Sequence, residues 1–169
     1  MPYKFKKYLK DNSQRTRDRA LTASSYKKAF ERKNGSPLSD EKTNTELATY
    51  GDAILKLAFC KILFDAGVSN ITVEKQKYES DEAFVKIIAR HYKLLEYIKF
   101  DEDDSNIPQN YDYLTKPNGK SPHKYIATVV EALVAAYYLD NSKNFSLVLE
   151  VAREWKRLID ESKSTEMIL

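Results

Sequence analysis

Two acidic residues are unusual because each lies inside a strongly apolar stretch. Asp52 follows Gly51 in TELATYGDAILKLAFCKILFD, and Glu131 lies in TVVEALVAAYYL. A carboxylate among apolar neighbours must be hydrogen-bonded, paired with a cation or bound to a metal. Two inward carboxylates on two central helices form one kind of Mg²⁺ site, since Mg²⁺ takes oxygen ligands and retains several waters. With phosphate bound, such an ion polarises the phosphoryl oxygen and supplies hydroxide for in-line attack.

Both acids also have a simpler interpretation. Gly51 would allow two helices to pack closely, Asp52 would face solvent at the edge of an apolar stripe, and Glu131 would be a surface acid at a face boundary. A Gly inside a helix costs about 1 kcal/mol relative to Ala, so the Gly-Asp pair indicates a reason beyond helix formation. On the same helix faces, Ala48 precedes Asp52 by four residues and Thr128 precedes Glu131 by three. Neither acid therefore has a second carboxylate beside it.

No other catalytic or metal-binding pattern accompanies the two acids. The sequence lacks HxxxH, CxxC and DxDxDG ligand spacings, a glycine-rich phosphate loop and a Ser-His-Asp arrangement. His91 and His123 stand alone, and the single Cys60 suits a small core residue. The pattern does not favour nucleotide hydrolysis, and one cysteine allows no disulfide within the chain.

Helices are the elements that must position the two acids. Gly and Pro are scarce, at 4 and 5 residues, which favours a helical protein over a sandwich or barrel. Apolar residues at helical spacing predict a central helix over Thr45–Asp65, which ends where Gly67 suits a left-handed cap. Leu47, Tyr50, Ile54, Ala58 and Ile62 form one apolar stripe of this helix, and Leu55, Phe59 and Leu63 form a second. A helix with two adjacent apolar faces is expected at the centre of the fold.

The same reasoning predicts four further helices and a long loop. The loop is the polar, acidic segment Asp101–Gly119, and loops of this length in compact domains are often functional or mobile. The predicted helices cover Arg15–Arg32, Ser80 to about Ile98, Ser121-Pro122 to about Asp140, and Phe145 to about Asp160.

Length and charge suggest one domain with a basic beginning. The 169 residues are enough for one well-cored domain and short for two. The net charge is only +3, but basic residues crowd the first fifth of the chain, a pattern typical of polyanion contact or of a solvated terminus. We expect a basic N-terminal arm over residues 1–14, a helical domain over 15–160 and a short C-terminal tail over 161–169.

The sequence also predicts where the protein is located. The N-terminus is basic but has no apolar run behind it, so no signal peptide is expected. No apolar stretch reaches the roughly 18 residues of a membrane-spanning helix without a charge. We expect a protein without membrane segments, in the cytoplasm or an organellar matrix.

Three segments, in this order, resemble the landmark segments of ribonuclease III domains. They are ALTASSY (Ala20–Tyr26), NTELATYGDAIL (Asn44–Leu55) and PHKYIATVVEALVAAYYLD (Pro122–Asp140). EAFVKIIARHYKLLEYI, between the last two, is similar to the intervening helix of that family, so the resemblance covers about Arg15–Trp155. It implies an all-α helical bundle, a homodimer formed around the Thr45–Asp65 helix, and Mg²⁺-dependent cleavage of double-stranded RNA, with Mn²⁺ as a substitute.

The resemblance assigns roles to individual residues. Asp52 and Glu131 match the metal-binding Asp and Glu of the family, and are the expected catalytic and metal-binding residues. Lys124 matches a basic position before the second acidic helix and would approach a phosphate, with Thr128 as a supporting residue. Ala48 and Thr128 stand where the family usually carries Glu and Asp, so half of the usual four-acid set is absent.

Different functions follow from this reduced acid set. The compact Mini-III branch similarly keeps the Asp and the Glu and lacks a separate double-stranded RNA-binding domain. On that interpretation the protein is an endoribonuclease for double-stranded or structured RNA, with a role in RNA processing that includes ribosomal RNA. The alternatives are an inactive RNA-binding or ribosome-associated module, and a helical protein-interaction domain without nucleic acid. We favour the enzyme, because an inactive site has little reason to keep two buried acids.

Contacts with RNA follow from its chemistry. Double-stranded RNA is recognised by shape, through phosphates and 2′-hydroxyls. A domain of this size without an accessory RNA-binding module needs a dimer to reach both strands. We expect additional phosphate contacts from the N-terminal arm or from Lys27, Lys28, Arg32 and Lys33.

Overall fold

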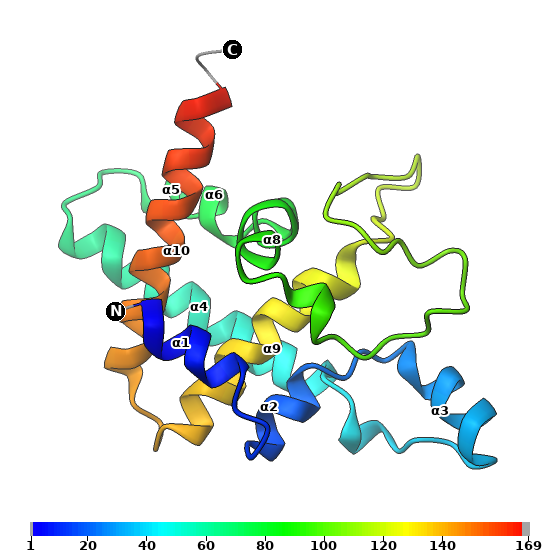
Figure 1. Ribbon diagram of the computed structural model, residues 1–169. Coiled ribbons are helices and arrows are strands. Elements are labelled where there is room, and N and C mark those ends of the chain that lie inside the picture. The colour runs from blue at the N-terminus through cyan, green and yellow to red at the C-terminus, as the bar shows by residue number, and fades with distance from the viewer. Residues whose placement is uncertain (1, 167–169) are drawn as a thin grey trace.

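A computed structural model of the chain describes residues 2–166 (Figure 1). Within that range the chain is helical, without a strand, and its one isolated bridge joins Thr22 to Lys99. The predicted all-α class is confirmed. The elements are α1 (Pro2–Leu9), α2 (Arg15–Ala20), α3 (Tyr26–Asn34), η1 (Asp40–Lys42), α4 (Thr45–Asp65), α5 (Ile71–Glu74), α6 (Gln76–Glu79), α7 (Asp81–Ala83), the π-helical η2 (Phe84–Ala89), α8 (Arg90–Tyr92), η3 (Leu94–Glu96), α9 (Lys124–Asp140) and α10 (Phe145–Glu166).

The crossing of α4 and α9 forms the centre of the fold. The bounds of α4 are those predicted from its apolar spacing, and α9 is buried along most of its length. A Cβ on Gly51 would overlap with the carbonyl oxygen of Glu131 and would lie 3.3 Å from the backbone nitrogen of Ala135. The two helix backbones therefore touch at Gly51, where a side chain has no room.

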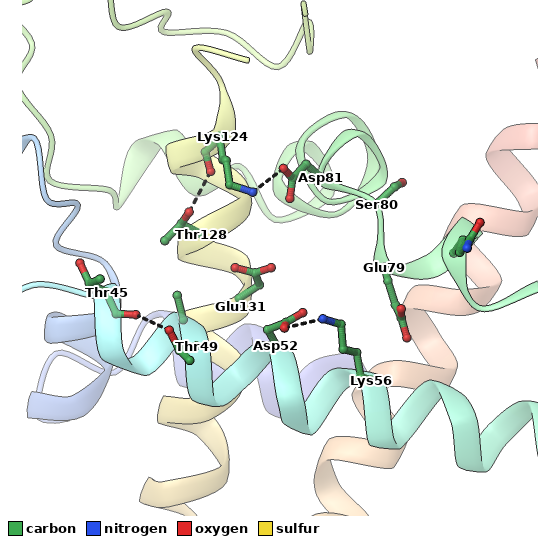
Figure 2. A pocket seen from close by; sticks show the side chains of 12 residues that line it. Thr45, Thr49, Asp52, Lys56, Glu79, Ser80, Asp81, Lys124, Thr128 and Glu131 are labelled. Atoms are coloured by element: carbon green, nitrogen blue, oxygen red, sulfur yellow. Dashed lines mark hydrogen bonds and ion pairs between the residues drawn. The ribbon is translucent and has the colours of Figure 1, made fainter. Parts of the chain in front are cut away.

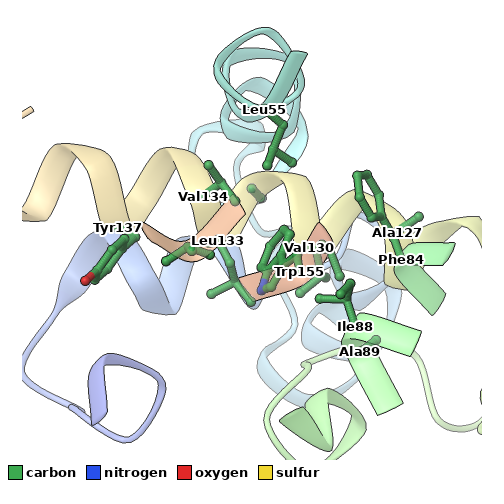
Figure 3. Close-up of a cluster of buried hydrophobic side chains, with 14 of the residues drawn as sticks. Leu55, Phe84, Ile88, Ala89, Ala127, Val130, Leu133, Val134, Tyr137 and Trp155 are labelled. Carbon is green, nitrogen blue, oxygen red and sulfur yellow. The ribbon is translucent and has the colours of Figure 1, made fainter. Parts of the chain in front are cut away.

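The main core surrounds this crossing (Figure 3). Leu55 of α4, Phe84 of η2 and Trp155 of α10 lie in one buried cluster with Leu133 and Val134 of α9. All five are at most 2 % exposed. Burying apolar side chains of this size stabilises the fold by about 1.5–3 kcal/mol each.

One residue of the predicted core stripe faces outward. Leu47, Ile54 and Ala58 are buried as expected, but Tyr50 is 43 % exposed. Its ring lies 6.1 Å from that of Tyr138, at the edge of the α4–α9 contact. The spacing of Tyr50 fits the stripe, but α9 covers only part of the circumference of α4.

The N-terminal segment differs from the arm that we expected. Residues 1–13 showed no helical period, yet Pro2–Leu9 forms α1, and Phe5 and Leu9 are each 2 % exposed. The ring centroid of Phe5 lies 5.2 Å from that of Tyr137 and 5.7 Å from that of Trp155. The lysines of α1 remain outside, so this segment is a core helix with a basic outer face. Residue 1 of the expected arm lies outside the described residues.

The first and the last predicted helix have different bounds in the structure. Arg15–Arg32 is divided into α2 and α3, because the chain between them bonds to a distant segment: Lys99 N–H donates to the Leu21 carbonyl at 2.8 Å, and Ala23 N–H donates to the Lys99 carbonyl at 2.9 Å. The last helix continues from the expected end near Asp160 to Glu166, so α10 includes most of the expected tail. Residues 167–169 of that tail lie outside the described range.

The residues that the sequence indicated as helix ends, Ser80 and Gly67, have these positions in the structure. Ser80 Oγ accepts a hydrogen bond from Ala83 N–H at 3.2 Å, which caps the helical segment of α7, η2 and α8. That segment ends earlier than expected, at Tyr92, because Lys93 adopts a left-handed conformation with φ of 54°. Gly67, with φ of 70°, follows α4 as predicted.

The long segment 101–119 is an irregular loop, as predicted, and it is tied to the start of α9. The buried His123 contacts Asn110 Oδ1 through Nε2 at 2.8 Å, and accepts the Leu114 N–H through Nδ1 at 3.4 Å. The Tyr125 hydroxyl donates to the Pro108 carbonyl at 2.8 Å. These bonds hold the loop beside the N-terminal end of α9.

Membrane segments were not expected. Among residues 2–166, no helix has the length and apolar character needed to cross a bilayer. The predicted compartment is not tested by this finding.

We predict that Gly51→Ala destabilises the protein. Helix propensity alone favours Ala by about 1 kcal/mol, but the added methyl group would push α9 away, and overpacking of this kind costs about 1–3 kcal/mol. Urea denaturation of both proteins gives the difference in unfolding free energy. Ala53→Gly, at an exposed position of α4, measures the propensity effect by itself. A Gly51→Ala variant more stable than the wild type would contradict the close backbone contact.

Candidate active site

An open cleft of about 670 Å³ lies beside the α4–α9 crossing (Figure 2). One side is formed by α4, another by α9, and the third by the segment from α6 to the start of α7. The side chains that line the cleft are mainly polar. They belong to Thr45, Ala48, Thr49, Asp52, Lys56, Gln76, Glu79, Ser80, Asp81, Lys124, Thr128 and Glu131.

The structure brings together the two acids that were selected from the sequence. Asp52 follows the contact residue Gly51 on α4, and Glu131 is the α9 residue whose carbonyl faces Gly51. Both side chains line the cleft, and Figure 2 shows them on the same side of the crossing. Asp52 is partly exposed, as the simpler interpretation required, but it faces this cleft.

The electrostatics of Glu131 reflect its surroundings. Its pKa is raised from the ordinary value of 4.5 to about 7, first by burial and then by the negative charges of Asp52 and Asp81. Lys124 and Lys56 oppose this shift. Burial and neighbouring acids together perturb the pKa of Glu131, and perturbed pKa values of this kind are typical of functional sites.

Two lysines lie on opposite sides of the acids. Lys56 Nζ donates to Asp52 Oδ2 at 2.7 Å, and Lys124 Nζ donates to Asp81 Oδ2 at 2.7 Å. Each hydrogen bond raises the pKa of its lysine. Lys124 was expected at the site, whereas Lys56 was not, although it follows Asp52 by one helical turn.

The two positions without acids also line the cleft. Ala48 offers no ligand atom. The Thr128 hydroxyl donates to the Lys124 carbonyl at 3.1 Å, so it is bonded within its own helix. Neither residue replaces a carboxylate in this structure.

Sequence reasoning missed two carboxylates, Glu79 and Asp81, which lie just before and at the start of the helix predicted from Ser80. Glu79 is bonded to Lys75 at 3.1 Å, and Asp81 begins α7 directly after the capping Ser80. The cap was a usable signal, since it fixes the start of a helix and thereby the position of Asp81.

The donor set suits a hard divalent cation. Asp52 and Glu131 offer carboxylate oxygens, and the open cleft admits the water that Mg²⁺ retains when it binds to one or two carboxylates. Across residues 2–166, no three His, Cys, Asp or Glu side chains converge into a metal site of their own. Two carboxylates with water are therefore the ligands that this cleft can offer.

Comparison with known proteins agrees with the resemblance noted in the sequence. The model of the ribonuclease III domain family matches residues 45–142, a range that contains both acids. The chain belongs to the ribonuclease III domain family. This match is to the family as a whole, so the Mini-III branch remains a prediction.

A solved structure has the same fold as this ribonuclease III domain. It is the nuclease domain of ribonuclease III from Campylobacter jejuni, described as showing structural flexibility in a region involved in dimer formation. The two chains have 19 % identity and a TM-score of 0.60, and the match covers 94 % of this chain and 95 % of the other. At this identity the likeness establishes the fold alone.

The four basic residues predicted to contact RNA lie on α3 of this ribonuclease III domain, and none of them lines the cleft. Lys27 pairs with Asp40, and Arg32 pairs with Asp101 and with Asp103. Lys28 and Lys33 are exposed. The charges of Lys27 and Arg32 are thus partly neutralised within the domain, which weakens their case as phosphate ligands.

We predict that Glu131 makes the stability of this ribonuclease III domain fall between about pH 4.5 and 7. The pKa of Glu131 in the folded protein lies above its ordinary value, so the unfolded chain loses the Glu131 proton at lower pH than the folded chain. The free energy of unfolding therefore decreases as the pH rises, and the decrease is complete above pH 7. A separation of about 2.5 pH units corresponds to at most about 3 kcal/mol, less the part that solvent screens in the open cleft.

Denaturation of the wild type and of Glu131→Gln at pH 4.5 and pH 8 measures this effect. The variant should gain stability relative to the wild type at pH 8, and the gain should disappear at pH 4.5. An equal difference between the two proteins at both pH values would refute the raised pKa.

Proposed function

We propose that the protein is a divalent-metal-dependent endoribonuclease that cleaves double-stranded or structured RNA. The observation that carries this proposal is the meeting of Asp52 and Glu131 in one open cleft of a ribonuclease III domain. Two carboxylates placed in one cleft, with the pKa of Glu131 raised by partial burial, lower the stability of the fold. A role in binding a cation and a phosphodiester explains that cost.

Asp52 and Glu131 would hold Mg²⁺, and Mn²⁺ is the substitute to use in experiments. When bound, the ion polarises the phosphoryl oxygen and supplies hydroxide at neutral pH. The protein's own residues position the RNA. Lys124, held at the cleft by Asp81, would donate to a phosphate oxygen, and Thr128 would support Lys124 through the hydrogen bond to its carbonyl.

An uncovered apolar stripe on α4 supports the proposal of a homodimer. Tyr50, Leu57 and Phe64 recur every seven residues, and Leu57 and Phe64 are 58 % and 74 % exposed. This spacing places them on one side of the helix, like the seam of a coiled coil. A second copy of the chain packed on this stripe would bury it and would supply a second cleft, one for each RNA strand.

We predict that Leu57→Asp prevents dimer formation at micromolar concentration, because it would place a charge in the centre of the apolar interface. Sedimentation velocity gives the mass of the wild type and of the variant. Val73→Asp is the matched control, since Val73 is 52 % exposed but lies on α5. A wild-type protein that is monomeric at concentrations where it cleaves RNA would contradict the dimer.

We predict that Asp52→Asn and Glu131→Gln each reduce RNA cleavage by on the order of 100-fold or more, because each removes a ligand charge. The assay follows a labelled RNA duplex and a structured ribosomal RNA precursor, with and without Mg²⁺. Asp65→Asn is the matched control. Asp65 lies on α4 outside the cleft and, like Asp52, pairs with a lysine four residues away.

The assay also decides against the alternative function. A folded wild-type protein that binds RNA but cuts neither substrate with Mg²⁺ or Mn²⁺ would overturn the enzyme. It would favour an inactive RNA-binding or ribosome-associated module, for which the absence of acids at Ala48 and Thr128 is the supporting observation.

A further inference from the structure

Lys56 is bonded to the proposed catalytic residue Asp52, and the proposed reaction gives it no role. Its ammonium group is bonded to Asp52 at 2.7 Å, one helical turn along α4. The side chains of Lys56 and Asp52 are 50 % and 38 % exposed. Figure 2 shows the Lys56 side chain extending along the wall of the cleft toward Asp52.

A second pair on the same helix shows what is unusual about Lys56. Lys61 and Asp65 are also four residues apart and bonded at 2.9 Å, with both side chains about half exposed. That pair does not line the cleft. Lys56, in contrast, also interacts electrostatically with Glu79 and Glu131. Lys56 therefore offsets the negative charge of several carboxylates in the cleft, and not only that of its helix neighbour Asp52.

The charges that line the cleft do not balance. Four carboxylates line the cleft with two lysines, and a third lysine, Lys75, bonds Glu79 at 3.1 Å from outside the lining, so one negative charge is in excess when Glu131 is ionised. This excess attracts a cation to the cleft. The carboxylates belong to Asp52, Glu79, Asp81 and Glu131, and the lysines are Lys56, Lys75 and Lys124.

The Lys56–Asp52 pair is well suited to exchange. Exposed pairs on a helix surface are weak, so little is lost when one opens. A lysine side chain is flexible and keeps its ammonium group solvated while it moves. A divalent cation carries twice the charge of the ammonium group and is attracted to the same Asp52 oxygens.

We propose that Lys56 is the resident counter-ion of the acidic cleft, which releases Asp52 when a divalent cation binds and then contacts a phosphate oxygen of the RNA. The first half concerns cation binding to the free protein. The second half rests on the proposed nuclease function, and it gives the reduced acid set a positive group beside the phosphate. In-line displacement at phosphorus needs positive charge near both the attacking and the leaving oxygen.

Mn²⁺ titration of the RNA-free protein, followed by electron paramagnetic resonance of the free ion, tests the first half. Lys56→Gln should bind Mn²⁺ about three- to tenfold more tightly than the wild type, because the competing ammonium group is gone. Lys61→Gln, the matched control, should leave the affinity unchanged. An unchanged or weaker affinity in Lys56→Gln would overturn the exchange, whatever the protein does to RNA.

Cleavage kinetics test the second half. At saturating Mg²⁺, kcat of Lys56→Gln should fall about tenfold, while the Mg²⁺ concentration for half-maximal rate also falls. Lys56→Arg should retain most of the wild-type rate, because it keeps the charge. A variant that merely failed to fold would not show a lower kcat together with a higher affinity for the cation. An unchanged kcat in Lys56→Gln would overturn the phosphate contact and leave the nuclease intact. If the wild type cuts no RNA, the nuclease and this contact both fail, and the Mn²⁺ titration still decides the exchange.

Discussion

The close approach of α4 and α9 at Gly51 is the constraint on which the rest of the structure depends. Without a side chain at Gly51, the α4 backbone reaches the carbonyl of Glu131. The same contact places Asp52, the next residue, and the Glu131 side chain at the mouth of one cleft. Gly51 is therefore costly for the helix but necessary for the crossing, and packing and site geometry depend on the same residue.

Electrostatics then explain why the cleft is more than a gap between helices. A pKa near 7 for Glu131 arises from burial and from neighbouring acids, and a protein selected for stability alone would avoid it. The lysines reduce this repulsion without removing it, since Lys56 and Lys124 are each bonded to one acid. A cleft in which carboxylates outnumber the lysines that pair with them suits a divalent cation.

Sequence patterns of short range determined much of this protein. The period of apolar residues fixed the bounds of α4, and the helical fold class followed from composition and spacing. Gly67 and Ser80 signalled helix ends correctly, because caps depend on residues within one turn. Asp52 and Glu131 were found from residue type and context, since a charge in an apolar helix is visible without knowledge of the partner helix, whereas Lys124 was assigned by the resemblance to the family.

Contacts between distant parts of the chain decided what the sequence could not. Phe5 is buried because Tyr137 and Trp155 lie beside it, more than a hundred residues away. The break between α2 and α3 depends on Lys99, and the charge of Arg32 is partly neutralised by Asp101. Glu79 and Asp81 join the site only because their segment folds against the crossing. In each case the deciding partner is remote in sequence, so no local pattern reports it. The sequence alone thus determined the helices and the two acids, and the tertiary structure decided which cations and acids surround them.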